Sequence, residues 1–319
     1  MLGLPNELDL EEWQAEALEA VGPERDTLVL GNRAAKPVDE AKLAAALGRI
    51  EGIDRVKSLV VQPSSRVQDI RFVASLPSLE TLDLRGGRLL SLDGIECFRR
   101  GRYLAIETGK NRKRDIARLC EAPIAKLSLQ FAKAADLQAI SASTTLRHLE
   151  VTNTPTLDLR EWRGVPLEIL ALWGGTIDRL EDTENVPTLR RVTLYGCRNL
   201  RRFDGRNGNV TWMVIQACNL LEWPTIGSFR NLQHLAITKI KPRIALSSFA
   251  GLRALRSLSL AQCTVEVDDP HLKRSAPKLE ELRVSGLEER LALELSRSNP
   301  AVVVSNGVRA YRDGIAVDG

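Results

Sequence analysis

The amino-acid sequence predicts an α/β repeat solenoid, in which short parallel strands stack side by side and caps cover the two open ends. Apolar residues recur in one pattern, apolar-x-x-apolar-x-apolar, in eleven segments that begin 21 to 24 residues apart. Three template positions in each segment give 33 positions, and all but Gly101 are apolar, whereas an apolar content of 44% gives roughly 15 by chance. Because one strand with a short return cannot bury its own apolar side, we expect the repeats to stack.

Residues 1–55 predict an N-terminal cap that is largely helical. Asp9 with Glu12 three positions later is a pattern typical of a helix N-terminus. It predicts a helix that begins there and stops near Gly22. The segment TLVLG at 27–31 predicts a strand, and VDEAKLAAALGRI after it predicts a second helix. This segment therefore closes the first end of the stack.

Residues 56–286 hold the eleven repeats. The fourth residue of the pattern marks the centre of each strand, at Leu59, Leu82, Leu104, Leu127, Leu149, Leu170, Val192, Met213, Leu235, Leu258 and Leu282. Between strands, some repeats continue with apolar residues at three-residue steps, as in Leu89, Leu92, Ile95 and Phe98. These steps predict a tight return on the side opposite the strands.

One repeat, LRRVTLYGC from Leu189 to Cys197, matches the motif L-x-x-L-x-L-x-x-N/C almost letter for letter. The chain therefore resembles the leucine-rich repeat family, in its short subclass with repeats of about 22 residues. The resemblance implies a horseshoe with a concave parallel β-sheet and a tight convex side. Most repeats lack the family's asparagine after the strand, and Cys197, Cys218 and Cys263 occupy that position in three of them.

Residues 287–319 predict an α/β C-terminal cap. LEERLALELSRS has a helical pattern, which Asn299 and Pro300 end, and AVVV after it predicts a last strand. We expect the final eight or so residues to be frayed.

The strand pattern also predicts which side chains are displayed. Neighbouring residues of a strand point to opposite faces, so the leucines of L-x-L face the core, and Trp173 faces outward. Of the eleven Trp, Tyr and His residues in the chain, six fall on the displayed positions, where roughly one is expected by chance. Small residues between them predict a shallow groove with aromatic walls. The predicted partner-binding residues are Tyr103, His148, Ile169, Trp173, Arg191, Tyr195, Trp212 and His234.

The sequence predicts no catalytic residues, no cofactor and no metal site. It contains only three histidines, and it has no Walker loop, no G-x-G-x-x-G and no H-E-x-x-H motif. The start of the chain lacks a secretory signal pattern, and no apolar run reaches about 18 residues, so we expect a cytoplasmic protein without a membrane span. The five cysteines are then expected to be reduced and mostly buried, although equivalent positions of Cys197 and Cys218 would permit a disulfide.

These features favour a non-catalytic scaffold that grips a protein or peptide partner on the concave sheet face. Three alternatives remain open: an inhibitor or immunity protein of a toxin or enzyme, a nucleic-acid binder, and a translocated bacterial effector, since the composition looks bacterial. The nucleic-acid alternative depends on the basic loop 109–118, which carries Lys110, Arg112, Lys113, Arg114 and Arg118. A solvated loop is the favoured interpretation of these residues, because no aromatic residues accompany them, and a net charge of +4 is only mildly basic.

Overall fold

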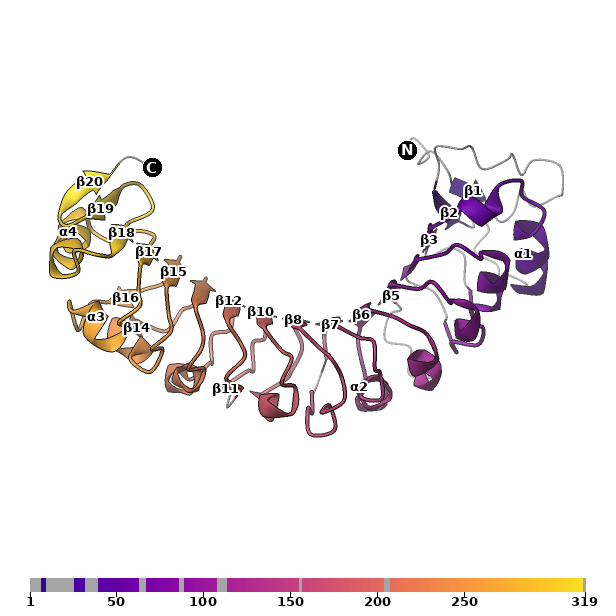
Figure 1. The fold of residues 1–319 in the computed structure, drawn as a ribbon, viewed down its shortest axis with the longest axis horizontal. Helices are drawn as coiled ribbons and strands as arrows, with labels where there is room; N and C mark the ends of the chain where they lie inside the picture. Colours follow the sequence, from indigo (N-terminus) through magenta and orange to yellow (C-terminus); the bar gives the residue numbers. More distant parts are fainter. Residues whose placement is uncertain are drawn as a thin grey trace. The chain divides into compact units, whose positions relative to one another are not determined.

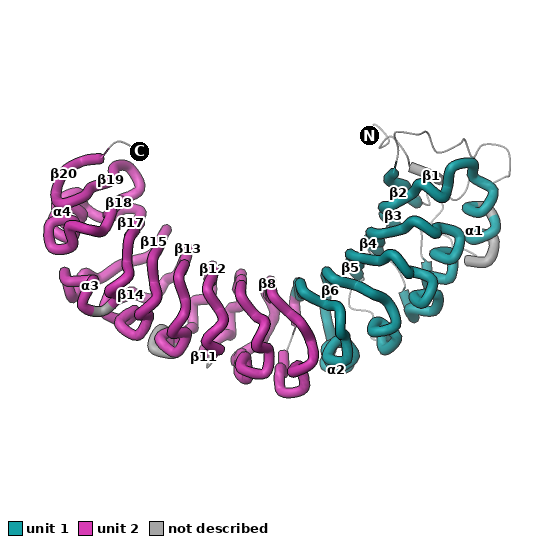
Figure 2. Tube along the Cα trace, viewed as in Figure 1, with its two compact units in different colours: residues 1–152 teal, residues 153–319 magenta. Residues whose placement is uncertain are grey.

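The structure is a computed structural model, and it describes residues 7–9, 26–31, 40–62, 67–85, 89–107, 114–154, 157–203 and 207–317. The chain divides into two compact units, Met1–Thr152 and Asn153–Gly319 (Figure 2). The division falls inside the predicted run of repeats, and the repeat pattern does not predict it.

Unit 1 contains a parallel sheet in which consecutive strands are neighbours. Equivalent repeat positions pair in register, for example Leu59 with Leu82, and Leu82 with Leu104. Its described strands are β1 (Glu7–Asp9), β2 (Thr27–Gly31), β3 (Ser58–Val61), β4 (Thr81–Arg85), β5 (Tyr103–Glu107), β6 (Lys126–Gln130) and β7 (His148–Thr152). The helices are α1 (Glu40–Leu47) and α2 (Ala134–Ile140), with 3-10 turns η1 (Ile53–Arg55), η3 (Arg71–Ser75), η4 (Ile95–Cys97) and η5 (Ala117–Glu121).

Unit 2 repeats this arrangement and ends in an antiparallel hairpin. Its parallel strands are β8 (Ile169–Trp173), β10 (Arg191–Tyr195), β12 (Trp212–Gln216), β13 (His234–Thr238), β15 (Ser257–Ala261), β17 (Glu281–Val284) and β18 (Val303–Ser305). The hairpin strands are β19 (Ala310–Arg312) and β20 (Ile315–Val317). Two short strand pairs lie in the returns: β9 (Arg179–Leu180) pairs with β11 (Arg202–Phe203), and β14 (Ile244–Ala245) pairs with β16 (Val265–Glu266). The returns also contain η6 (Thr183–Asn185), η7 (Trp223–Ser228), η8 (Leu246–Phe249), α3 (Leu272–Ser275) and α4 (Glu289–Ser298).

The apolar pattern explains why the repeats stack. The inward residues of each strand are buried, as are the return residues Leu89, Leu92, Ile95 and Phe98 that the three-residue steps mark. Large rings fill the returns of unit 2, where the rings of Phe203 and Phe229 lie 4.7 Å apart between centroids. In each unit the strands lie on one side and the helical turns on the other (Figure 1). The predicted strand-and-return solenoid is therefore confirmed.

A turn with a left-handed residue ends most strands of unit 2. Gly174 and Gly196 have φ angles of 68° and 64°, and their amides donate to the carbonyl oxygens of Tyr195 and Gln216, the last residues of the next strands. Glycine adopts this backbone region without the steric cost of a Cβ. These turns fix the ends of β8 and β10, and with them the positions of Trp173 and Tyr195.

The caps agree with the predictions in part. Strand β2 and helix α1 form where predicted, and β2 pairs with β3 in the register of the repeats, Leu28 opposite Leu59. Residues 7–9 form a strand that the sequence pattern did not predict, and the helix predicted from Asp9 to Gly22 lies outside the described residues beyond that strand.

At the other end, α4 and β18 form where predicted. The predicted frayed end is wrong, because β19 and β20 extend the sheet as a hairpin whose Tyr311 side chain is buried and donates from its hydroxyl to Glu289 of α4, 2.9 Å away.

Candidate partner-binding face

The exposed sheet face of unit 2 is built from alternate residues of five neighbouring parallel strands. Register pairing places equivalent residues side by side, so the face has three columns. The first column contains Ile169, Arg191, Trp212, His234 and Ser257, the middle column contains Ala171, Thr193, Val214, Ala236 and Ser259, and the last column contains Trp173, Tyr195, Gln216, Thr238 and Ala261. We call these fifteen positions the unit 2 face.

Two aromatic residues lie side by side in the last column. The rings of Trp173 and Tyr195 are 5.0 Å apart between centroids and are tilted by 41°. They remain 39% and 41% exposed, although both are large apolar side chains. Trp173 therefore lies on the outward face, as strand alternation predicts, and the two rings form one exposed aromatic surface.

A third aromatic residue lies in the first column next to the face's one formally charged residue. The guanidinium carbon of Arg191 lies 5.6 Å from the centroid of the Trp212 ring, a cation–π distance, and Trp212 is 39% exposed. Arg191 forms no ion pair with any residue that the structure describes. The exposed His234 occupies the position beside Trp212 on the next strand.

The middle column between them consists of small side chains. Thr193, Val214 and Ala236 are half-buried, whereas Ala171 is buried. All four side chains are smaller than the aromatic rings of the flanking columns, and Ala171 is the most buried of them. The predicted column of small residues is therefore present, and the shallow groove with aromatic walls stays a prediction.

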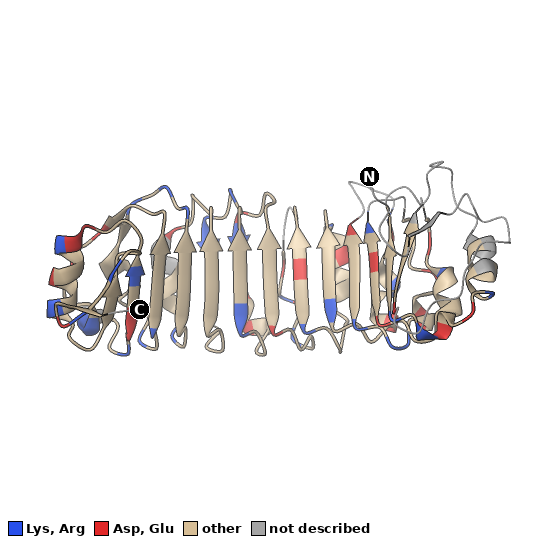
Figure 3. Cartoon of the chain, turned by 90° about the horizontal axis from the view of Figure 1, so that it is seen from above, with Lys and Arg blue, Asp and Glu red and all other residues tan. Residues whose placement is uncertain are grey.

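Charge distinguishes this face from the equivalent positions of unit 1. On the unit 2 face, Arg191 is the single Lys, Arg, Asp or Glu among the fifteen positions, and Figure 3 shows mostly uncharged strands there. The displayed positions of unit 1 include Asp83, Arg85, Glu107, Lys126 and Glu150. The unit 2 face is therefore close to neutral and rich in aromatic surface.

The two predicted contact residues of unit 1, Tyr103 and His148, belong to a polar network. His148 Nε2 lies 3.0 Å from Glu150 Oε1, and Lys126 Nζ lies 3.1 Å from the same oxygen and 5.1 Å from the centroid of the Tyr103 ring. Hydrogen bonding from His148 and then from Lys126 outweighs partial burial and lowers the pKa of Glu150 to about 2. The eight predicted residues thus fall into two groups, two in unit 1 and six in unit 2.

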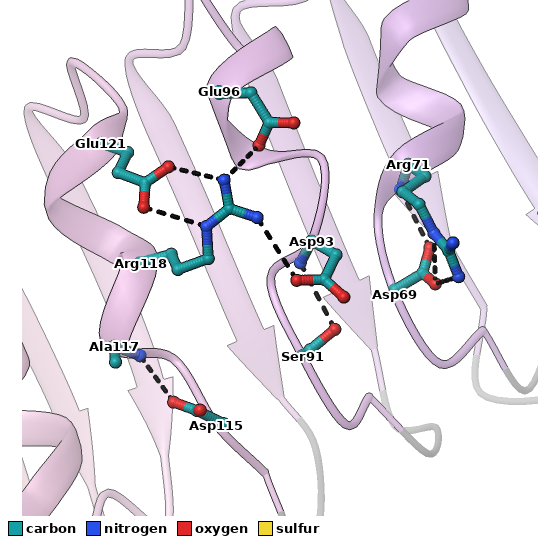
Figure 4. Close-up of polar contacts among 9 residues, drawn as sticks. All are labelled: Asp69, Arg71, Ser91, Asp93, Glu96, Asp115, Ala117, Arg118 and Glu121. Atoms are coloured by element: carbon teal, nitrogen blue, oxygen red, sulfur yellow. Dashed lines mark hydrogen bonds and ion pairs between the residues drawn. The ribbon is translucent and has the colours of Figure 1, made fainter.

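Two of the five basic residues of the loop 109–118, Arg114 and Arg118, form ion pairs with carboxylates. Arg118 contacts three carboxylates, Asp93 at 3.3 Å, Glu96 at 3.0 Å and Glu121 at 2.7 Å (Figure 4). Arg114 is buried, pairs with Asp136, and donates to the backbone oxygens of Gln130 and Phe131. Both side chains therefore connect neighbouring repeats, and the favoured interpretation of a solvated loop is wrong for Arg114, which is buried. The other three, Lys110, Arg112 and Lys113, lie outside the described residues.

All five cysteines are free thiols, but only two are buried. Cys197 and Cys218 are buried, Cys97 and Cys263 are half-buried, and Cys120 is exposed, so the expectation of mostly buried thiols is only partly met. The Cys197 thiol donates to the Gly174 carbonyl oxygen at 3.5 Å, and hydrogen bonding with Cys218 together with burial raises the pKa of the Cys197 thiol. Both thiols stand at the asparagine position of the repeat motif and donate to backbone carbonyl oxygens, Cys197 to Gly174 and Cys218 to Gln216.

Sequence reasoning missed a cleft at the C-terminal end of unit 2. It has a volume of about 1120 Å³ and lies where β15, β17 and β18 meet the β19–β20 hairpin. Its charged lining residues are Glu281, Arg283, Arg309 and Arg312. The hairpin forms one wall of this cleft, so a sequence analysis that expects a frayed C-terminus does not predict the cleft.

Within the described ranges, no three His, Cys, Asp or Glu side chains group as metal ligands, and no helix is long and apolar enough to cross a membrane. No protein-family model matches the chain, and none of the curated proteins does.

Among solved structures, an internalin from Listeria monocytogenes is 17% identical, covering 88% of this chain and 86% of its own, with a TM-score of 0.47. A TLR13–ssRNA13 complex is 13% identical over 88% of this chain and 56% of its own, with a TM-score of 0.40. A leucine-rich repeat protein from Leptospira interrogans is 12% identical over 88% and 89%, with a TM-score of 0.35. The chain's own geometry, one strand and one return per repeat with the L-x-x-L-x-L residues inside, makes its fold a leucine-rich repeat solenoid.

Proposed function

We propose that the protein is a non-catalytic scaffold that binds a protein or peptide partner on the unit 2 face. The observation that carries the proposal is the concentration of exposed aromatic surface on a nearly neutral sheet face. The proposed contact residues are Ile169, Trp173, Arg191, Tyr195, Trp212 and His234, and Tyr103 and His148 are proposed as contacts on unit 1.

Exposed aromatic residues at these positions favour a binding role on physical grounds. The fold does not need them for its core, because the inward residues Leu170 and Leu172 of the same strand are already fully buried. Contiguous exposed apolar surface marks interaction sites in soluble proteins, and Trp, Tyr and Arg are the residue types that dominate binding hot spots. Trp173, Tyr195 and the Arg191–Trp212 pair supply all three types.

The same face does not favour the nucleic-acid alternative. Nucleic acids bind through several simultaneous contacts of Lys or Arg with phosphates. The unit 2 face offers one such residue, Arg191, and two of the loop cations are already paired with carboxylates. A partner with a largely neutral, apolar contact segment fits this face better.

The test begins by capturing the partner from the source cell and measuring its affinity for purified variants. Trp173→Ala and Trp212→Ala should each weaken binding by about thirtyfold, because truncation of a hot-spot residue costs about 2 kcal/mol. Leu220→Ala is the matched control, since Leu220 is 47% exposed and lies in a return, outside the strands. Full affinity of both tryptophan variants, or equal weakening by the control, would refute the assignment of the face.

A further inference from the structure

The C-terminal cleft of unit 2 has walls that side-chain contacts connect to the rest of the unit. Its outer wall is the hairpin, which Tyr311 and Arg309 anchor to Glu289 of α4, at 2.9 Å and 3.3 Å. The loop at the tip is held by Asn306, whose side-chain oxygen accepts from the amides of Val308 and Arg309. The sheet wall comes from displayed residues of β15, β17 and β18.

Arginine side chains give the cleft a positive character. Arg283 Nη2 lies 2.6 Å from Glu281 Oε1, and Ser257 donates to the other oxygen of Glu281 at 3.1 Å, so that carboxylate is already engaged. Arg309 uses one nitrogen on Glu289. Arg312 is exposed and forms no ion pair among the described residues. Three guanidinium groups and one carboxylate, the engaged Glu281, therefore line the cleft, and N–H donors of the arginines remain available there.

The rest of the lining is suited to a polypeptide. The hydroxyl groups of Ser259, Ser285 and Ser305 lie on the sheet side, while Val303, Val308 and Val317 supply apolar surface. A volume of about 1120 Å³ exceeds the roughly 300–1,000 Å³ that is typical of small-molecule pockets. The cleft is thus larger than a small anion needs, and its polar groups are spread along it.

We infer that this cleft binds an acidic peptide segment, whose Asp or Glu carboxylates pair with Arg312 and Arg283. Planar guanidinium groups match carboxylates with two parallel hydrogen bonds. A polyphosphate fits less well, because Glu281 lies in the lining and repels dense negative charge. The inference rests on the proposed function for the idea that the acidic segment belongs to the partner, since the cleft shares Ser259 with the unit 2 face.

The experiment uses the full chain and dye-labelled hexaglutamate, with binding followed by fluorescence anisotropy at low salt. Hexaglutamine is the neutral control peptide. Arg312→Gln should weaken hexaglutamate binding by about fivefold, the effect of losing one exposed charge-assisted contact, and adding Arg283→Gln should weaken it further. Arg290→Gln is the matched control, because Arg290 is an exposed arginine of α4 outside the cleft lining, and it should stay within about twofold of wild type.

Unchanged binding in Arg312→Gln, or equal binding of hexaglutamine, would overturn the inference. Binding of inorganic triphosphate at the same arginines without binding of hexaglutamate would overturn it too, and would identify a phosphate site instead. Leu220→Ala, the control of the partner-binding test, should leave hexaglutamate binding unchanged. Hexaglutamate binding tests the cleft, whereas affinity for the captured partner tests the unit 2 face. The two proposals can therefore fail independently.

Discussion

Trp173 and Leu170 lie three residues apart on one strand, and they should respond in opposite ways to truncation. Leu170 is fully buried, whereas Trp173 is 39% exposed. Trp173→Ala should reduce partner affinity at a smaller cost in folding free energy, while Leu170→Ala should unfold the protein more readily. The pair therefore separates residues that hold the repeat together from residues that the repeat displays.

The magnitudes follow from burial and contacts. Replacing a fully buried leucine by alanine costs about 3 kcal/mol, through lost transfer free energy and the cavity left behind. Trp173 loses its contact with Tyr195, 5.0 Å away between ring centroids. Such a pair contributes about 1 kcal/mol beyond the burial of its area, and the buried part of the ring adds about 1 kcal/mol or more. We therefore expect a loss of about 2 kcal/mol for Trp173→Ala, less than for Leu170→Ala, because truncation on an exposed face leaves no closed cavity.

Thermal unfolding followed by circular dichroism measures the difference. At about 2 °C per kcal/mol for a chain of this size, Leu170→Ala should lower the Tm by about 6 °C and Trp173→Ala by about 4 °C. Urea unfolding of the same variants checks the order independently. If Trp173→Ala lowers the Tm as much as Leu170→Ala does, the ring belongs to the packing, and the assignment of Trp173 to a binding surface fails.

Two further predictions concern titration and thiols. Glu150→Gln should destabilise the protein by about 1 kcal/mol at pH 7 after allowance for solvent screening. Because the pKa of Glu150 in the folded protein is about 2, below the ordinary 4.5, the difference in stability from wild type should shrink as the pH falls from 4.5 toward 2. Urea unfolding at pH 7 and pH 3 measures this difference, and a difference that stays constant contradicts the prediction. Among the thiols, the exposed Cys120 should react first with a thiol reagent, and the buried Cys197 and Cys218 should react only after denaturation. The denatured, unreduced protein should then show five free thiols, and a count below five contradicts the free-thiol assignment.

The strand positions were predictable because burial imposes them directly. Only one side of each repeat strand can be buried, so the L-x-x-L-x-L residues mark the strands, and all eleven form where the pattern places them. Trp173 on the outward face follows from the same alternation. The pattern also identified the buried return residues, because three-residue steps keep Leu89 and Leu92 on the inner side of the turn.

Contacts between distant residues were not predictable from the pattern. Arg118 pairs with Asp93 and Glu96, residues of the preceding return, and nothing in its own sequence neighbourhood indicates those partners. The hairpin strands β19 and β20 are three residues each, too short to show an alternation. Their stability depends on Tyr311 packing onto α4, which is a tertiary contact, so the cleft that they form was missed.

The two proposed sites of unit 2 lie within reach of a single extended segment. The middle column continues from Val214 through Ala236 and Ser259 to Arg283, each residue paired in register with the next. Three strand spacings of about 4.8 Å separate Val214 from Arg283, roughly 14 Å in all. An extended chain covers this distance in about four residues. A partner segment with an apolar side chain at one end and carboxylates about four residues away therefore reaches Trp212 and the arginines together, whereas Trp173 and Tyr195 lie further along the sheet, on β8 and β10.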